Sequence, residues 1–150
     1  MGTHYKGTED EVRALDAYIK LVRGAESVAS RLNSLATAAG LTLSQFGALE
    51  ALFHLGPLCQ RELGDKLLKS SGNITMVVDN LEKRRLVKRQ RGGEDRRFVT
   101  VHLTEQGRRL ITSIFPRHVS AIVKEMSSLT KREQEELGRL CRKLGREERR

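Results

Sequence analysis

The sequence predicts a mainly α-helical fold that carries one small β-hairpin. Apolar residues recur at steps of three and four along most of the chain, which is the spacing of one face of an α-helix. After Leu86 the pattern changes to alternation on both sides of a glycine-containing turn, which is typical of two paired strands. Two short helices joined by a tight turn precede this hairpin, and helical segments flank the whole unit. This order of elements predicts a winged helix-turn-helix between N- and C-terminal helices.

A long first helix is predicted over about residues 9–39, with Gly40 as its C-terminal stop. Its apolar face consists of Val12, Leu15, Ile19, Val22, Ala29, Leu32 and Ala36. This helix is far longer than the roughly 12 residues of an average helix in a globular protein. We therefore expect it to extend beyond its own domain and to pack on a second copy of the chain.

Three shorter helices are predicted next, and the last two form the helix-turn-helix. They cover about residues 42–56, 60–68 and 73–84. Thr42 or Ser44 supplies the capping hydroxyl of the first, which ends at Gly56. The break at 70–72 gives the short turn that a helix-turn-helix requires. The inward-facing residues of the middle helix are Leu63, Leu67 and Leu68.

The hairpin and two further helices complete the chain. The strands are predicted at about residues 86–91 and 98–103, around a turn at 92–95, with Leu58 as a one-residue strand before the third helix. Thr104 caps the next helix, in which Pro116 predicts a kink, and the last helix begins near Thr130. We assign residues 1–150 to one domain, with dimerisation helices at about 9–39 and 105–147 and the winged helix-turn-helix at about 42–104.

Positive charge is in excess and is clustered. The 150-residue chain has a formal net charge of +9, and residues 83–97 contain eight Lys or Arg and two acidic residues. This run covers the end of the fourth helix and the hairpin, where a protein docked in a DNA groove meets phosphates. An isolated basic run would more simply be a solvated face. Its position after a helix-turn-helix favours double-stranded DNA as the partner.

The fourth helix has one apolar and one polar side. Its predicted core side consists of Ile74, Val77, Val78 and Leu81. The helix start and the other side carry small polar groups that suit phosphates and base edges. The predicted DNA contacts here are Ser70, Ser71, Gly72, Asn73, Thr75, Met76, Asn80 and Lys83. Ser71 could instead serve as the N-cap of the helix, or do both.

Two stretches of the sequence resemble the MarR family of transcriptional regulators. One is Asp95-Arg96-Arg97 followed by residues 101–107, which is similar to the family's D-x-R…L-T-x-x-G pattern. The other comprises residues 72–75 and 78–82 of the fourth helix. The resemblance covers about residues 10–145. It implies a homodimer with interleaved first and last two helices, which binds a pseudo-palindromic operator as a repressor.

The resemblance also implies roles for residues of the predicted hairpin, which is the wing of the winged helix-turn-helix. Arg97 would enter the minor groove, Asp95 would orient it, and Arg96 would contact phosphate or support the hairpin. A narrow minor groove concentrates negative potential and attracts arginine, which agrees with this assignment. Arg91 completes the predicted set of wing contacts.

The fourth helix departs from the family at two positions. Many members carry arginine where this chain has Met76 and Asn80. Without bidentate arginine–guanine contacts, base reading would rest on Asn73, Thr75 and Asn80, with Met76 against a thymine methyl group.

A narrower resemblance, to the quinone-responsive MhqR-like branch of the family, rests on residues 46–57, 71–79 and 114–118. Family members commonly hold a small-molecule pocket between the dimer helices and the winged domain. The residues expected to line it are Tyr18, Phe46, His54, Phe115 and His118. The implied effector is a small phenolic or other aromatic ligand. Each of these residue types is also common in a plain hydrophobic core.

Other classes of function are disfavoured by the residue pattern. Cys59 and Cys141 lack metal-ligand spacing and are expected to be buried thiols of a reducing compartment. No apolar run approaches the roughly 20 residues that cross a bilayer, and the polar N-terminus is no signal peptide, so we expect a soluble, cytoplasmic protein.

No catalytic or cofactor motif stands out. The histidines lack metal-site spacing, and neither a nucleophile elbow nor a glycine-rich phosphate loop is present in the sequence, so we expect no enzyme, metal or cofactor. Two alternatives stay open: a thiol- or quinone-based redox-sensing regulator, and a winged-helix interaction module that binds protein or RNA instead of DNA.

Overall fold

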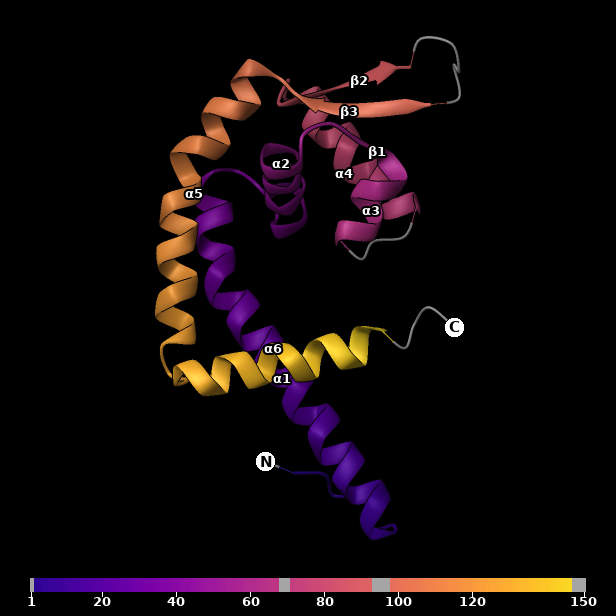
Figure 1. Cartoon of the computed structure of the whole chain (residues 1–150), viewed down its shortest axis with the longest axis vertical. Helices are drawn as coiled ribbons and strands as arrows, with labels where there is room; N and C mark the ends of the chain where they lie inside the picture. Colours follow the sequence, from indigo (N-terminus) through magenta and orange to yellow (C-terminus); the bar gives the residue numbers. More distant parts are fainter. Residues whose placement is uncertain (1, 68–70, 93–97, 147–150) are drawn as a thin grey trace.

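The computed structural model describes residues 2–67, 71–92 and 98–146. Within them the elements are α1 (Glu9–Ala38), α2 (Leu43–Leu55), β1 (Leu58–Cys59), α3 (Gln60–Leu67), α4 (Ser71–Lys83), β2 (Val87–Arg91), β3 (Val99–Leu103), α5 (Glu105–Met126) and α6 (Lys131–Arg146). This order confirms the predicted winged helix-turn-helix between N- and C-terminal helices (Figure 1).

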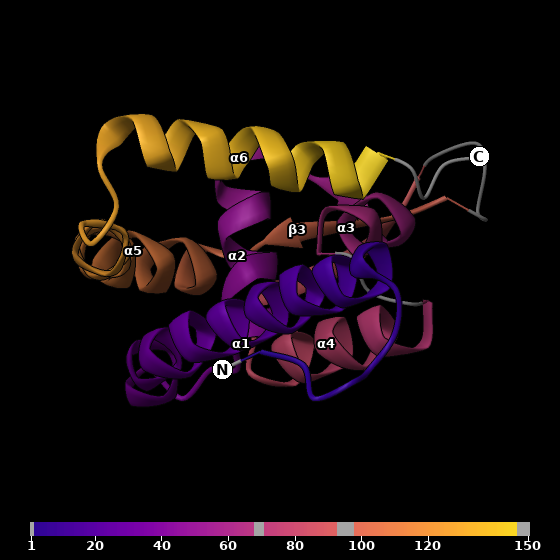
Figure 2. The same cartoon turned by 90° about the horizontal axis from the view of Figure 1, so that it is seen from below.

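The helices divide into a compact lobe and three long arms. The lobe consists of α2, α3, α4 and the small sheet, and α1, α5 and α6 extend away from it (Figure 1). An ion pair joins α1 to α5, with Arg31 Nε 2.6 Å from Glu125 Oε2. The ribbons of α1 and α6 cross in Figure 1 but lie at different depths, as the turned view of Figure 2 shows. Most of each long helix lies outside the lobe, although Ala36 of α1 and Ile111 of α5 are buried in its core.

Side-chain caps set the ends of the helices. Thr42 is the N-cap of α2, because its hydroxyl accepts the N–H of Gln45 at 3.1 Å and its own N–H donates to Gln45 Oε1 at 3.0 Å. Thr130 and Glu133 form the same reciprocal pair before α6. Gly40, with φ of 72°, follows the end of α1 as predicted.

Some boundaries differ from the predicted ones. Helix α4 begins at Ser71 rather than at residue 73, and β2 begins at Val87 rather than at Leu86. The reason for the second shift is that the N–H of Leu86 donates to the carbonyl of Leu81 at 3.0 Å, which closes the end of α4. Helix α5 continues through Pro116.

The three strands form one antiparallel sheet in the order β1-β3-β2. Val101 in β3 pairs with Leu58 on one side and with Arg89 on the other. The predicted one-residue strand at Leu58 is a two-residue strand that ties the start of α3 to the wing. Val101 is buried, whereas Thr100 Oγ1 and His102 Nε2 lie 2.8 Å apart, so β3 alternates as predicted.

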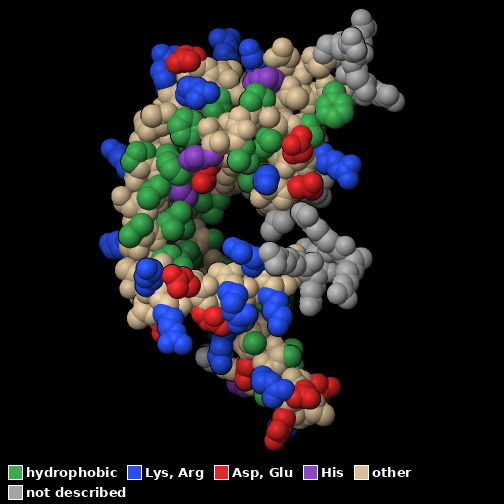
Figure 3. All heavy atoms as spheres, viewed as in Figure 1, with side chains coloured by type: hydrophobic (Ala, Val, Ile, Leu, Met, Phe, Trp, Pro, Cys, Tyr) green, Lys and Arg blue, Asp and Glu red, His purple; other side chains and the backbone are tan. Residues whose placement is uncertain are grey.

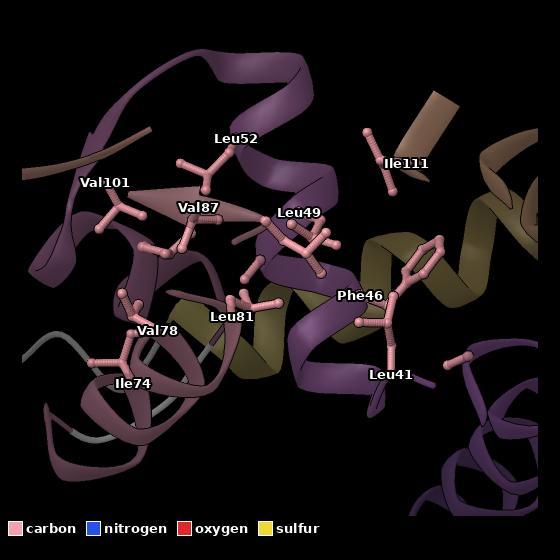
Figure 4. Close-up of a cluster of buried hydrophobic side chains, with 14 residues drawn as sticks. Leu41, Phe46, Leu49, Leu52, Ile74, Val78, Leu81, Val87, Val101 and Ile111 are labelled. Atoms are coloured by element: carbon pink, nitrogen blue, oxygen red, sulfur yellow. The ribbon is translucent and has the colours of Figure 1, made fainter. Parts of the chain in front are cut away.

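The core of the lobe lies between α2, α3, α4 and the sheet (Figure 4). Its largest fully buried side chains are Leu49, Leu63, Ile74, Leu81, Ile111, Val78, Val87 and Val101. Ile74, Val78 and Leu81 are thus the inward side of α4, with Val77 partly buried beside them, as predicted. Leu63 and Leu67 of α3 also pack inward, whereas Leu68 is outside the described residues. Burial of one side of α4 leaves its other side directed outward.

A strained residue joins α4 to the wing. Among the described non-glycine residues, Arg85 alone has a positive φ, at 60°, and its side chain is exposed. A left-handed conformation costs a residue with a Cβ atom about 1 kcal/mol or more relative to glycine. We expect Arg85→Gly to raise the free energy of unfolding by about 1 kcal/mol in urea denaturation.

Arg85→Ala is the matched control, since it removes the same exposed side chain but keeps the Cβ atom. It should leave the free energy of unfolding within about 0.5 kcal/mol of the wild type. Equal stabilisation by both substitutions would assign the effect to loss of the charge, not to relief of backbone strain.

Candidate nucleic-acid interface

The outward side of α4 carries the residues predicted to contact DNA. Met76 is 63% exposed, and Asn73, Thr75 and Lys83 are exposed as well, while Asn80 is half-buried. Gly72 is exposed near the start of the helix, and a Cβ atom there would meet nothing within 4 Å. Ser71 is the first residue of α4, and Ser70 lies outside the described residues. One helix side thus presents amide, hydroxyl and thioether groups together.

The wing stands beside this helix. Strands β2 and β3 extend from the lobe near α4 (Figure 1), and Arg91, at the end of β2, is exposed. The N–H of Gly92 donates to the carbonyl of Phe98 at 2.7 Å, which closes the described part of the hairpin. The predicted wing contacts Asp95, Arg96 and Arg97 lie outside the described residues, so their assignment stays a prediction.

Arg89 of β2 is a residue that the sequence analysis did not single out. Its guanidinium lies between two carboxylates of α4, with Nη2 2.6 Å from Asp79 Oδ1 and Nη1 3.0 Å from Glu82 Oε1. It also donates to Gln60 Oε1 of α3 at 3.3 and 3.4 Å. Asp79 and Glu82 lie one helical turn apart on α4, and an arginine follows in the next strand. This spacing was the sequence signal from which the two ion pairs could have been predicted. In the sequence Arg89 is one of eight Lys or Arg residues in the basic run at 83–97.

The start of α3 lies against the wing. A cavity of about 480 Å³ is lined there by Cys59, Gln60, Arg61, Arg89, Phe98 and Val99. Cys59 acts as a helix cap, because its N–H donates to Glu62 Oε1 at 3.3 Å and its Sγ accepts the N–H of Glu62 at 3.5 Å. Hydrogen bonds from the Cys59 side chain and backbone lower the pKa of Glu62. Cys59 therefore has a structural task at this position.

Four of the five predicted effector-pocket residues come together between α2 and α5. The ring centroids of Phe46 and His118 lie 4.2 Å apart, and those of His54 and Phe115 lie 4.9 Å apart. Phe46 is buried, so this cluster also serves the core. Tyr18 lies elsewhere, 63% exposed on the N-terminal half of α1, beside a cavity of about 390 Å³ under the N-terminal segment. The pocket assignment stays a prediction.

Neither a metal-binding cluster nor a membrane-spanning helix is found among the described residues. No group of three or more His, Cys, Asp or Glu residues there could hold a metal ion. No helix among the described residues is long and apolar enough to cross a membrane. Cys141, expected to be buried, is exposed on α6, whereas Cys59 is half-buried.

Comparisons with known proteins agree with this architecture. Residues 39–97 match the model of the MarR family. The HTH-type transcriptional regulator MhqR of Bacillus subtilis is 35% identical over 133 residues, which cover 89% of this chain and 92% of MhqR.

Two solved structures share the fold at low sequence identity. The MarR family regulator Sco3205 of Streptomyces coelicolor, crystallised in complex with DNA, has a TM-score of 0.83 at 22% identity, covering 95% of this chain and 90% of that one. BpsR of Bordetella bronchiseptica, whose DNA binding is described as regulated by 6-hydroxynicotinic acid, has a TM-score of 0.78 at 23% identity, covering 86% and 98%. With the family model and the relative of near-equal length, these findings establish that the chain belongs to the MarR family of transcriptional regulators.

Proposed function

We propose that this chain works as a homodimer that binds a pseudo-palindromic operator in double-stranded DNA and represses transcription until a small aromatic ligand releases it. The observation that carries the proposal is the two-sided character of α4. Ile74, Val78 and Leu81 anchor one side in the core, and the polar side is presented next to the basic wing. An α-helix held in this way fits the major groove of B-DNA.

We expect the outward residues of α4 and the wing to contact different parts of the DNA, some of them bases and others phosphates. The amides of Asn73 and Asn80 suit adenine, and the Met76 side chain suits the methyl group of thymine. Lys83 and Arg91, at the helix end and on the wing, suit phosphates and carry no sequence information. We therefore expect base preference to lean toward A·T pairs at the positions that α4 reads.

The wing supplies a second contact through residues outside the described part of the structure. We place Arg97 in the minor groove, Asp95 as the group that orients it, and Arg96 on phosphate or in support of the hairpin. Replacement of Arg97 by alanine should weaken DNA binding and reduce the slope of log Kd against log salt concentration by about one. Fluorescence anisotropy over a salt series measures both quantities.

Glu94→Ala is a control three residues away in the sequence, because it removes no positive charge. Its salt slope should not fall below that of the wild type. If Arg97→Ala keeps the wild-type affinity and slope, Arg97 does not contact DNA and the wing assignment is wrong.

A second copy of the chain would cover the apolar sides of the long helices. Figure 3 shows hydrophobic side chains gathered along α5 on the face in view. The exposed large hydrophobic residues on α1, α5 and α6 are Tyr18, Leu21, Val119, Ile122, Val123, Leu137, Leu140 and Leu144. We place the dimer interface on these helices and the winged helix-turn-helix outside it, within a single domain. A two-fold dimer of this kind reads two half-sites about one helical turn, roughly 10 bp, apart.

The aromatic cluster between α2 and α5 is our candidate for the effector site. It lies where the lobe meets a dimerisation helix, so a ligand there would act on the angle between them. Phe115 and His118 offer flat rings and a ring nitrogen that suit a phenol. The regulation of BpsR by 6-hydroxynicotinic acid, an aromatic ring with a hydroxyl group, supports this class of ligand.

A thiol-based sensor is the second candidate, and Cys59 is its test. Serine can replace the thiol as a helix cap, so we expect Cys59→Ser to keep the fold and the DNA affinity. We also expect this variant to be released by a phenolic ligand as the wild type is. If the substitution abolishes release by oxidants or quinones while DNA binding survives, the regulator is a redox sensor.

The remaining alternative is a winged helix that binds protein or RNA. A competition assay separates this alternative from sequence-specific DNA binding. A sequence-specific DNA-binding protein is displaced from its probe by duplexes that it has itself selected, but not by the same amount of bulk genomic DNA. MhqR of Bacillus subtilis is a transcriptional regulator of a bacterium, where the chromosome lies in the cytoplasm. We accordingly propose a cytoplasmic regulator without catalytic activity.

A further inference from the structure

One guanidinium group, that of Arg89, connects three elements of the lobe. It contacts Asp79 and Glu82 on α4 and Gln60 on α3, and it is itself part of β2. The backbone N–H of Arg89 adds a hydrogen bond of 2.9 Å to Glu82 Oε2, so Glu82 holds both the side chain and the main chain of the strand. Nη2 also reaches the carbonyl oxygen of Thr75 at 3.5 Å. Arg89 therefore fixes the wing and α3 relative to the exposed part of α4.

The contacts of Arg89 also decide the orientation of the Gln60 amide. The guanidinium of Arg89 can only donate hydrogen bonds, so the oxygen of the Gln60 amide, Oε1, faces it. The NH2 group of Gln60 therefore points away from Arg89. That NH2 group donates to Thr75 Oγ1 at 2.7 Å. Thr75 stands on the outward side of α4 beside Met76. A chain of hydrogen bonds thus runs from the strand, through α3, to a residue predicted to read DNA.

Charge and exposure set Arg89 apart from the other two described cations of β2, Lys88 and Arg91. Its side chain is 24% exposed and has two carboxylates within 3.0 Å, so its charge is neutralised locally. Lys88 and Arg91, on either side of it in the same strand, are exposed. A phosphate contact requires an unneutralised cation turned toward solvent, which describes these neighbours better than Arg89.

We propose that Arg89 is a positioning residue for DNA recognition, which sets the placement of the outward side of α4 against the wing and, through Gln60, orients Thr75. This inference rests on the proposed function, since it assigns sequence selectivity to a residue that touches no base. Arginine is required because only its planar fork can hold two carboxylates and the amide oxygen at once. Lysine would keep the charge but not this geometry.

Selectivity and salt dependence distinguish this role from a phosphate contact. Loss of a phosphate contact weakens binding to all sequences alike and reduces the salt slope by about one. Loss of positioning weakens binding to the preferred sequence more than to other DNA and leaves the slope unchanged, because no counterion-releasing contact is removed.

The experiment compares Arg89→Lys and Gln60→Met with Arg91→Ala in the full chain. The probes are a duplex that the wild type selects from a random-sequence pool and a scrambled duplex of the same composition. We expect the ratio of the two dissociation constants to fall about tenfold in Arg89→Lys and in Gln60→Met, with the wild-type salt slope. Arg91→Ala should keep the ratio and lose about one unit of slope.

Gln60→Met keeps Arg89 and both carboxylates, so it tests the relay to Thr75 even if Arg89→Lys unfolds. Wild-type selectivity in Gln60→Met refutes the relay, and wild-type selectivity in a folded Arg89→Lys refutes the positioning role. A fall of about one in the salt slope of Arg89→Gln, which removes the charge that Arg89→Lys keeps, makes Arg89 a phosphate contact instead. Failure of the wild type to select any duplex would contradict the proposed function itself, a different result from either of these.

Discussion

Gly107→Ala should lower the free energy of unfolding by about 3 kcal/mol or more, a large part of the roughly 5–15 kcal/mol that stabilises a typical domain. Gly107 is buried in the first turn of α5, where its N–H donates to the Thr104 hydroxyl at 3.0 Å. A Cβ atom at this position would overlap the carbonyl oxygen of Leu86 and lie 2.9 Å from its carbonyl carbon. The first turn of α5 therefore packs directly on backbone.

Leu86 cannot move aside to make room. Its N–H is bonded to the carbonyl of Leu81 at 3.0 Å, and its carbonyl accepts the N–H of Thr104 at 3.1 Å. Its side chain is buried in the core. Any shift of this backbone would break the junction of α4, β2 and α5 together, which is why the expected loss exceeds that of an ordinary helical glycine.

Gly24→Ala is the matched control for this prediction. Gly24 is also helical and exposed, and a Cβ atom there would meet nothing within 4 Å. Its replacement should raise the free energy of unfolding by up to about 1 kcal/mol through helix propensity alone. Urea denaturation followed by circular dichroism measures both variants. A loss below about 1 kcal/mol for Gly107→Ala would contradict the close backbone contact.

Leu140→Glu should convert a dimer into monomers and abolish selective DNA binding. Leu137, Leu140, Cys141 and Leu144 lie at helical spacing on one side of α6, and every described side chain of α6 is exposed in the single chain. The side chain of Leu140, in the middle of this row, is 45% exposed. Placing a carboxylate among buried leucines of a partner would raise the dimer dissociation constant about a hundredfold or more.

Arg142→Glu places the same residue on the opposite side of α6 and is the control. It changes the charge by more than Leu140→Glu does, yet it should leave the dimer intact. Sedimentation velocity over a concentration series gives the dissociation constants. If Leu140→Glu has the same dimer dissociation constant as the wild type, the leucine side of α6 is not part of the interface.

Local patterns in the sequence were sufficient to predict most of the fold. Thr42 and Thr130 each form the expected cap, and Ile74, Val78 and Leu81 form the expected core side of α4. These features depend on hydrogen bonds and spacings within a few residues, which the sequence displays directly.

Features that depend on distant residues were not predicted. The contact of Arg89 with Gln60 joins residues 29 positions apart in the chain, and nothing within the basic run itself distinguishes Arg89 from Arg91. The sequence predicts Tyr18 in the same pocket as Phe46, but Tyr18 lies on the N-terminal half of α1, away from the rings between α2 and α5. A helix of this length carries its ends far from each other, and a residue pattern does not reveal which end meets the lobe.

Dimeric, sequence-specific DNA binding is tested by selecting duplexes from a random-sequence pool with the purified chain and footprinting the selected duplexes. A homodimer of this kind should protect a site with two inverted half-sites roughly 10 bp apart, bound by two copies of the chain. Recovery of no common sequence, or protection of a single half-site by one copy, would contradict a dimeric, sequence-specific DNA-binding regulator.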